Sequence, residues 1–168
     1  MAVPLKIDIT TGDKVTPKEI LYKFQLLFEP RKINVLAYNL ETILAEKLET
    51  IISRGDQNTR PRDFYDIYIL YKLQWQNVDI STLKTALYAT SEKRKTLHII
   101  CRYKKILHVI IKSDVMNNHW KSYQKDFDYA NDIDFIDVCQ TIENIMYTIA
   151  PADKIILKNQ KDAQSAPV

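Results

Sequence analysis

The first 40 residues contain short runs in which apolar and polar side chains alternate. Residues 5–10, LKIDIT, carry their apolar side chains at the odd positions and their polar ones at the even positions. A period of two is typical of a β-strand with one packed face. Residues 22–28 and 33–38 are two further strand candidates, separated by the break Glu29-Pro30-Arg31. The pattern therefore predicts a small sheet of three short strands, which would leave an exposed sheet edge.

After residue 38 the hydrophobic period becomes helical. Asn39 suits the N-cap of a helix that runs to Arg54, where Gly55 would end it. The proline at position 61 suits the first turn of a second helix. Further helices are predicted at residues 80–93, 97–112, 118–126 and 133–149, although the paired isoleucines in 97–112 also allow a strand there.

These patterns predict an α+β fold that is mostly α, with a small, partial sheet region followed by a helical bundle. The expected divisions are the sheet region at residues 1–38, a helical domain at 39–157 and a disordered tail with little apolar content at 158–168. The length of 168 residues suits one domain, and 46% hydrophobic residues are enough for a substantial core.

Composition excludes several classes of protein. Two glycines in the whole chain are too few for a P-loop or a Gly-rich dinucleotide turn. No apolar run approaches the roughly 20 residues that a membrane span needs, and no charged leader precedes an apolar run at the N-terminus. We therefore expect a cytoplasmic protein without a membrane partner. The net charge of +3 is only a mild bias towards anionic partners.

Charged residues stand at unexpected positions in the first predicted helix. At about 100° per residue, its aliphatic side chains form one stripe, with Lys47 close to the middle and Arg54 near the edge. Glu46 and Glu49 fall on the opposite side, which we expect to face solvent. The stripe consists of Leu40, Ile43, Leu44, Leu48 and Ile51. Burying an unpaired ammonium costs several kcal/mol, so Lys47 needs an anionic partner or an anionic ligand.

The second predicted helix supplies candidate partners for that lysine. It is apolar nearly all round, which is typical of a buried helix, but Asp63 and Asp66 lie one turn apart on the same side. Arg60 and Arg62 precede them. Two interpretations stay open. The charges form an internal ion-pair network, or Lys47 binds a triphosphate while an aspartate orients a metal, a base or the lysine itself.

Asp8 lies between two isoleucines of the first predicted strand. With both neighbours turned inward, its carboxylate would have the fixed geometry that a metal ligand needs. An ordinary solvent-facing aspartate would show the same pattern, so the strand by itself leaves both interpretations open.

Basic residues gather in the second half of the chain, with Tyr103 among them. They are Lys93, Arg94, Lys95, Arg102, Lys104, Lys105 and Lys112. Cations interleaved with an aromatic ring can follow an RNA backbone. A solvated helix face is the alternative interpretation.

Three passages resemble the abortive-infection toxin nucleotidyltransferases, the AbiEii/AbiGii toxin family. They are KIDITTGD at 6–13, YNLETILAEKLETIISR at 38–54 and NTRPRDFYDIYIL at 58–70, and the segment at 120–142 is similar to the family's C-terminal helical region. The resemblance spans residues 4–150. It implies a nucleotidyltransferase sheet with a helical domain that closes over it.

The resemblance also implies roles for individual residues. Asp8 would be the sheet carboxylate that helps to bind Mg²⁺, and Lys47 the helix lysine that contacts nucleotide phosphates. Arg54, near the edge of the same stripe as Lys47, is a further candidate for nucleotide binding. Asp63 would be the aspartate of the family's Arg-Asp motif, with Asp66 beside it in the catalytic group. Some members of the family are toxins that add nucleotides to transfer RNA and are restrained by a cognate antitoxin.

The chain departs from the family at the family's first motif, a Gly-Ser turn followed by Asp-x-Asp. No Gly-Ser occurs in the sequence. The Asp-x-Asp sequences at 126–128 and 132–134 follow no glycine turn and fall in the late helical region, so we interpret them as unrelated. We therefore expect that the chain begins partway through the catalytic domain. We also expect it to be inactive alone, because two-metal catalysis needs carboxylates that hold ions about 3.5–4 Å apart.

The sequence leads to two hypotheses about function. The first is the C-terminal part of a toxin that transfers a nucleotide from an NTP to an acceptor such as tRNA, with Mg²⁺ as cofactor. The second is a non-catalytic interaction module that binds an antitoxin, an RNA or a complementary half-protein through the exposed sheet edge.

Overall fold

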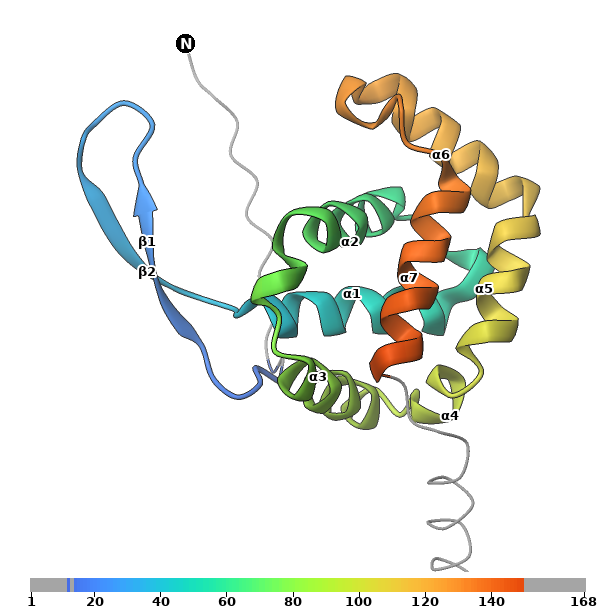
Figure 1. Cartoon of the computed structure of the whole chain (residues 1–168), viewed down its shortest axis with the longest axis horizontal. Helices are drawn as coiled ribbons and strands as arrows, with labels where there is room; N and C mark the ends of the chain where they lie inside the picture. The colour runs from blue at the N-terminus through green and yellow to red at the C-terminus, as the bar shows by residue number, and fades with distance from the viewer. Residues whose placement is uncertain (1–11, 13, 150–168) are drawn as a thin grey trace, which may run out of the picture.

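A computed structural model describes residue 12 and residues 14–149. The strand predicted at 5–10, Asp8 within it and the tail predicted at 158–168 lie outside these residues. Within them the fold is α+β and mostly helical, as predicted, with a hairpin followed by a bundle of helices (Figure 1). None of the helices in the described part of the chain is long and apolar enough to cross a membrane.

The elements follow one another in a simple order. The strands are β1 (Ile20–Gln25) and β2 (Lys32–Ala37). The α-helices are α1 (Leu40–Arg54), α2 (Pro61–Gln74), α3 (Ile80–Lys93), α4 (Leu97–Ile100), α5 (Tyr103–Lys112), α6 (Asp114–Asp126) and α7 (Phe135–Ile149). Three short 3₁₀ helices connect them: η1 (Gly55–Gln57), η2 (Trp75–Asn77) and η3 (Asp128–Ala130).

The two strands form an antiparallel hairpin that projects from the helical body (Figure 1). Tyr22 lies opposite Val35 in the register. The first strand begins earlier than the predicted 22–28. It also ends earlier, because the backbone N–H of Leu26 donates to the carbonyl oxygen of Arg31 at 3.2 Å and closes the turn there. The second strand is likewise displaced by one residue from the predicted 33–38.

The hairpin is tied to the start of α1 through buried polar side chains. Asn39 caps α1 by accepting a hydrogen bond from the backbone N–H of Thr42 at 3.1 Å, as its residue type predicts. The Asn39 amide also donates to the carbonyl oxygen of Thr16 at 2.7 Å, and the Thr42 hydroxyl accepts from the N–H of Thr16 at 3.0 Å. The segment before β1 is therefore held at the base of the bundle.

Helix α1 is the central element of the bundle, and it contacts α2, α3, α4 and α5 (Figure 1). Leu44, Leu48 and Ile51 are fully buried along it. The helix ends at Gly55, whose φ of 57° is the left-handed conformation that glycine adopts without strain. The predicted bounds of this helix are confirmed at both ends.

The later helices differ from the predicted bounds in three places. The predicted helix at 97–112 is broken into α4 and α5, because the N–H of Arg102 bonds to the carbonyl oxygen of Ile99 at 2.8 Å in a tighter turn. Helix α6 begins before the predicted position 118, since the Ser113 hydroxyl caps it by accepting from the N–H of Met116. Helix α7 begins two residues after the predicted position 133.

Aromatic side chains join α2, α6 and α7 on the other side of the core. The ring of Phe135 lies 5.5 Å from that of Phe64 and 5.7 Å from that of Trp120, measured between centroids. The indole N–H of Trp120 donates to the carbonyl oxygen of Ile133 at 2.9 Å. This satisfied hydrogen bond allows the indole to be buried at the joint.

Candidate functional site

Lys47, Asp63 and Asp66 meet between α1 and α2. The ammonium nitrogen of Lys47 lies 2.8 Å from Asp63 Oδ1 and 2.8 Å from Asp66 Oδ2, and it donates a hydrogen bond to each. Arg62 Nε approaches Asp66 Oδ2 at 4.0 Å from the exposed side. The structure therefore brings together the lysine and the two aspartates that the sequence placed on neighbouring helices.

The helix spacing explains why these three side chains meet. Asp63 and Asp66 are three residues apart, so they lie on one side of α2, and that side faces α1. The cluster is half-buried, because the side chains of Lys47 and Asp63 are 22% and 15% exposed. Helix α2 is itself less buried than its composition predicted, since Phe64 and Ile67 are its two fully buried residues.

The protonated form of Lys47 is stabilised at this position. Burial by itself would lower the pKa of Lys47, but the hydrogen bonds and charges of Asp63 and Asp66 outweigh it. The pKa of Lys47 therefore lies above its ordinary value, and the side chain stays cationic at neutral pH.

The other predicted site residues do not join this cluster. Arg54 is exposed at the C-terminal end of α1, seven residues from Lys47, which is about 10 Å along the helix axis. Asp8 lies outside the described residues, so its predicted role as a metal ligand stays a prediction. Both Asp-x-Asp sequences lie on the surface, in or beside α6 and before α7, and their aspartates are exposed.

The described residues, 12 and 14–149, contain no cluster of several metal-ligating side chains. No group of three or more His, Cys, Asp or Glu side chains in this part of the chain is arranged to hold a metal ion. The carboxylates of Asp63 and Asp66 both accept hydrogen bonds from Lys47. Both carboxylates are therefore engaged with the lysine, and their predicted catalytic roles stay predictions.

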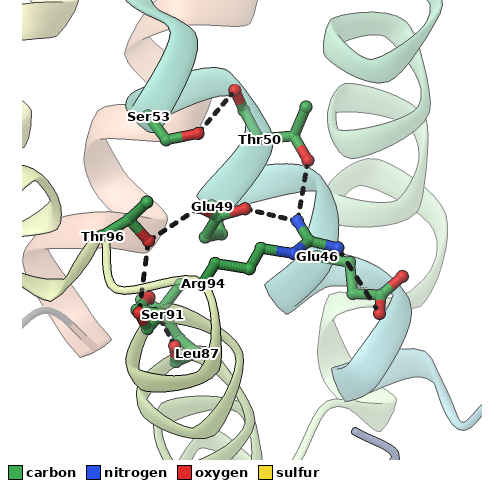
Figure 2. A network of polar contacts seen from close by, with 8 residues as sticks. All are labelled: Glu46, Glu49, Thr50, Ser53, Leu87, Ser91, Arg94 and Thr96. Carbon is green, nitrogen blue, oxygen red and sulfur yellow. Dashed lines mark hydrogen bonds and ion pairs between the residues drawn. The ribbon is translucent and has the colours of Figure 1, made fainter. Parts of the chain in front are cut away.

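A second charged cluster, which the sequence analysis missed, lies on the opposite flank of α1 (Figure 2). Glu49 was expected to face solvent, but its side chain is only 2% exposed. Its carboxylate pairs with the Arg94 guanidinium and accepts a hydrogen bond from the Thr96 hydroxyl at 2.8 Å. Arg94 also donates to the hydroxyl of Thr50 at 3.2 Å and lies 3.8 Å from Glu46.

The Glu49 cluster fastens the C-terminal end of α3 to α1. Arg94 is the residue that caps α3, and the next residue, Lys95, has a positive φ of 59° that turns the chain back. At the other end of α3, the Glu41 carboxylate accepts a hydrogen bond from the backbone N–H of Asp79 at 2.9 Å. Two acids of α1 therefore hold both ends of α3.

A groove of about 270 Å³ lies between α2 and α7 on a different face of α2 from the lysine cluster. Tyr68, Tyr71 and Lys72 line it from α2, and Gln140 and Asn144 line it from α7. Both tyrosines are also part-buried against the core.

The comparisons with known proteins agree with the resemblance noted in the sequence. Residues 1–146 match the family model described as nucleotidyl transferase AbiEii toxin, type IV toxin–antitoxin system. No curated protein and no solved structure gives a significant match. The family match covers both helices that carry the lysine cluster.

The raised pKa of Lys47 predicts a loss of stability at alkaline pH. Above the unfolded pKa of 10.5, the folded protein still binds a proton that the unfolded chain has released. The stabilisation is complete below that pH and is lost as pH rises through the folded pKa. In urea unfolding between about pH 10 and 12, the free energy of unfolding of the wild type should therefore fall more steeply than that of Lys47→Met. Parallel curves for the two proteins would contradict this.

Removing Arg94 should destabilise the fold through Glu49. Arg94→Ala leaves a buried carboxylate with part of its hydrogen bonding lost, which costs at least about 1–3 kcal/mol. Thermal unfolding followed by circular dichroism should show a Tm lower by several degrees. Lys84→Ala, which removes an exposed cation from the first half of α3, is the control and should change Tm little. Equal Tm values for the two variants would show that the cluster is not structural.

Proposed function

The chain belongs to the AbiEii family of nucleotidyl transferase toxins of type IV toxin–antitoxin systems. From this premise we propose that it takes part in transferring a nucleotide from an NTP to an RNA acceptor such as tRNA. The observation that carries the proposal is the ammonium of Lys47, held in a half-buried position by Asp63 and Asp66. Family membership also implies a cognate antitoxin.

Lys47 has the geometry of a positioned phosphate donor. An ammonium has three N–H groups, and two of them donate to Asp63 and Asp66, so one is left that no contact among the described residues uses. The two aspartates restrict the rotation of the long side chain, and a donor that is already oriented loses less entropy when it binds.

The cluster offers an oriented hydrogen-bond donor but almost no net charge. Lys47 and Arg62 together carry two positive charges, and Asp63 and Asp66 carry two negative ones, so the four groups are formally neutral. A triphosphate would therefore bind through a hydrogen bond from the oriented N–H of Lys47. A positive electrostatic potential over the whole cluster would contribute little. Such a donor is most effective where charge develops on phosphate oxygens during transfer. In this proposal Asp63 and Asp66 act as positioning residues for Lys47, and Arg54 would meet the nucleotide from the end of α1.

We propose that the chain needs further carboxylates to complete catalysis. Magnesium would polarise the phosphates, and Asp8 is the residue expected to bind it. Two-metal transfer needs several carboxylates around a pair of ions, and the sequence has no Gly-Ser turn with Asp-x-Asp to supply them. A polypeptide that carries this motif would have to supply the missing groups, and the chain alone would be inactive. The cytoplasm, where NTPs and tRNA are present, is the compartment that this activity requires.

The lysine's role is tested by nucleotide binding. Lys47→Met removes the charge while keeping an unbranched side chain, and it should weaken NTP binding at least about tenfold, because a hydrogen bond to a charged group contributes about 1.5–3 kcal/mol. Equilibrium dialysis with each of the four NTPs measures the affinity, and Lys84→Met is the control for a lost surface cation. Lys47→Arg, which keeps the charge, should retain part of the affinity. Unchanged affinity in a folded Lys47→Met protein would remove the assigned role.

A second candidate function, a protein-interaction module, is favoured by the exposed hairpin. One face of the hairpin is wholly apolar and is formed by Ile20, Tyr22, Phe24, Ile33, Val35 and Ala37. At the turn, Leu27 and Phe28 are 87% and 97% exposed. A two-stranded hairpin is marginal in water by itself, so an apolar face of this extent favours a covering partner. We propose that the partner is a complementary polypeptide that adds strands or packs on this face and carries the missing Asp-x-Asp motif.

Substitutions on the apolar hairpin face should weaken that association. Phe24→Ser with Ile33→Ser replaces a cross-strand apolar pair, and isothermal titration with the Asp-x-Asp polypeptide should show affinity at least about tenfold lower. Lys23→Ser, on the other face of the same strand, is the control and should bind like the wild type. Equal binding by the double variant and the control would contradict the proposed surface.

A further inference from the structure

One segment of the chain, residues 93–113, contains no acidic residues. The 21 residues at 93–113 contain seven of the chain's 24 lysines and arginines and none of its 21 aspartates and glutamates. A solvated protein surface normally mixes both signs. Arg94 is engaged with Glu49, but most of the other cations of this segment have no structural role of that kind in the described residues.

Helix α5 gathers these cations on one exposed face. Lys104, Lys105, His108 and Lys112 are all exposed, and at 100° per residue they fall within about 100° of the helix circumference. The opposite side of α5 is buried through Leu107 and Ile110 and contacts α7 and η1. The basic face is therefore fixed in orientation by the core behind it.

The spacing of the lysines suits a chain of phosphates. Lys104 and Lys112 are eight residues apart, which is about 12 Å along the helix, and a nucleic-acid strand presents several phosphates over that length. Lysines that share a helix face without an intervening acid repel one another and destabilise the free helix slightly. An anionic ligand that follows the helix would relieve this repulsion.

An exposed aromatic ring borders the same face. Tyr147 of α7 is 75% exposed, and the ammonium of Lys104 lies 5.5 Å from the centroid of its ring. A ring in water beside cations is the combination that binds single-stranded nucleic acid, because a base can stack on the ring while its phosphates meet the lysines. An acidic protein segment would use the lysines but would gain nothing comparable from the ring.

We infer that the exposed face of α5, bordered by Tyr147, binds the phosphate backbone of RNA and stacks an unpaired base on the tyrosine. The inference rests on the proposed function, for which this RNA is the acceptor, but its residues are separate from Lys47 and the two aspartates. We call this face the α5 basic surface. It consists of Lys104, Lys105, His108 and Lys112 of α5, together with the neighbouring Tyr147 of α7.

The test compares two triple variants with the same loss of charge. Lys104→Gln/Lys105→Gln/Lys112→Gln removes the α5 basic surface, and Lys84→Gln/Lys121→Gln/Lys125→Gln removes exposed lysines from α3 and α6. Fluorescence anisotropy with a labelled single-stranded oligoribonucleotide and with a labelled tRNA transcript measures affinity as a function of salt. The first triple should bind at least about tenfold more weakly and show a salt slope lower by about 2–3, while the control triple should change affinity less than about threefold.

Tyr147→Ala tests the stacking part of the inference. It should weaken binding of the single-stranded oligoribonucleotide about fivefold or more and leave the salt slope unchanged, because stacking involves no counterion release. Tyr147→Phe, which keeps the aromatic ring, is the control and should bind like the wild type. An unchanged affinity for Tyr147→Ala would overturn the role of the ring.

Two outcomes would overturn the inference as a whole. Equal losses of affinity in both triple variants would show that binding depends only on net charge. Displacement of the RNA by poly-glutamate at equal charge concentration would show that the surface recognises acidic chains in general. The nucleotide affinity of the α5 triple variant should stay that of the wild type. RNA binding that persists while NTP binding is absent would refute the Lys47 proposal alone, and the reverse result would refute only the α5 basic surface.

Discussion

The structure depends on burying a helix that carries charges of both signs. Helix α1 is enclosed by four other helices, so its acidic and basic side chains cannot all reach bulk water. Lys47 meets Asp63 and Asp66 on the side of α2, and Glu49 meets Arg94 and Thr96 on the side of α3 and α4. An unpaired charge at either position would cost more free energy than a single domain can easily lose.

These ion pairs also determine which charged side chains can still bind a ligand. The Glu49 cluster stabilises the turn after α3 and offers no group to a ligand. The carboxylate of Glu49 is almost fully buried and already accepts hydrogen bonds from two side chains. The Lys47 cluster is less buried and keeps one N–H that no described contact uses. The same physical requirement thus produces a structural joint on one flank of α1 and a candidate ligand-binding donor on the other.

Two exposed surfaces, on the hairpin and on helix α5, differ in their chemistry. The hairpin presents apolar side chains and is attached to the bundle through Thr16, Asn39 and Thr42, so its position is defined although its faces are exposed. Helix α5 presents cations on a rigid support. One surface suits association with protein and the other suits phosphate, and neither overlaps the lysine between α1 and α2.

The sequence by itself determined the class of fold, the bounds of α1, the family and the need of Lys47 for an anionic partner, because caps, hydrophobic period and charge are local properties of the chain. The sequence also put Asp63 and Asp66 on one side of α2. Only the tertiary structure decided that both carboxylates hold the lysine and that Glu49 is buried. A helical wheel assumes one buried face, whereas α1 is packed on several sides, and Arg94 lies 45 residues away from Glu49. Contacts at that separation depend on how the helices assemble, which no local pattern encodes.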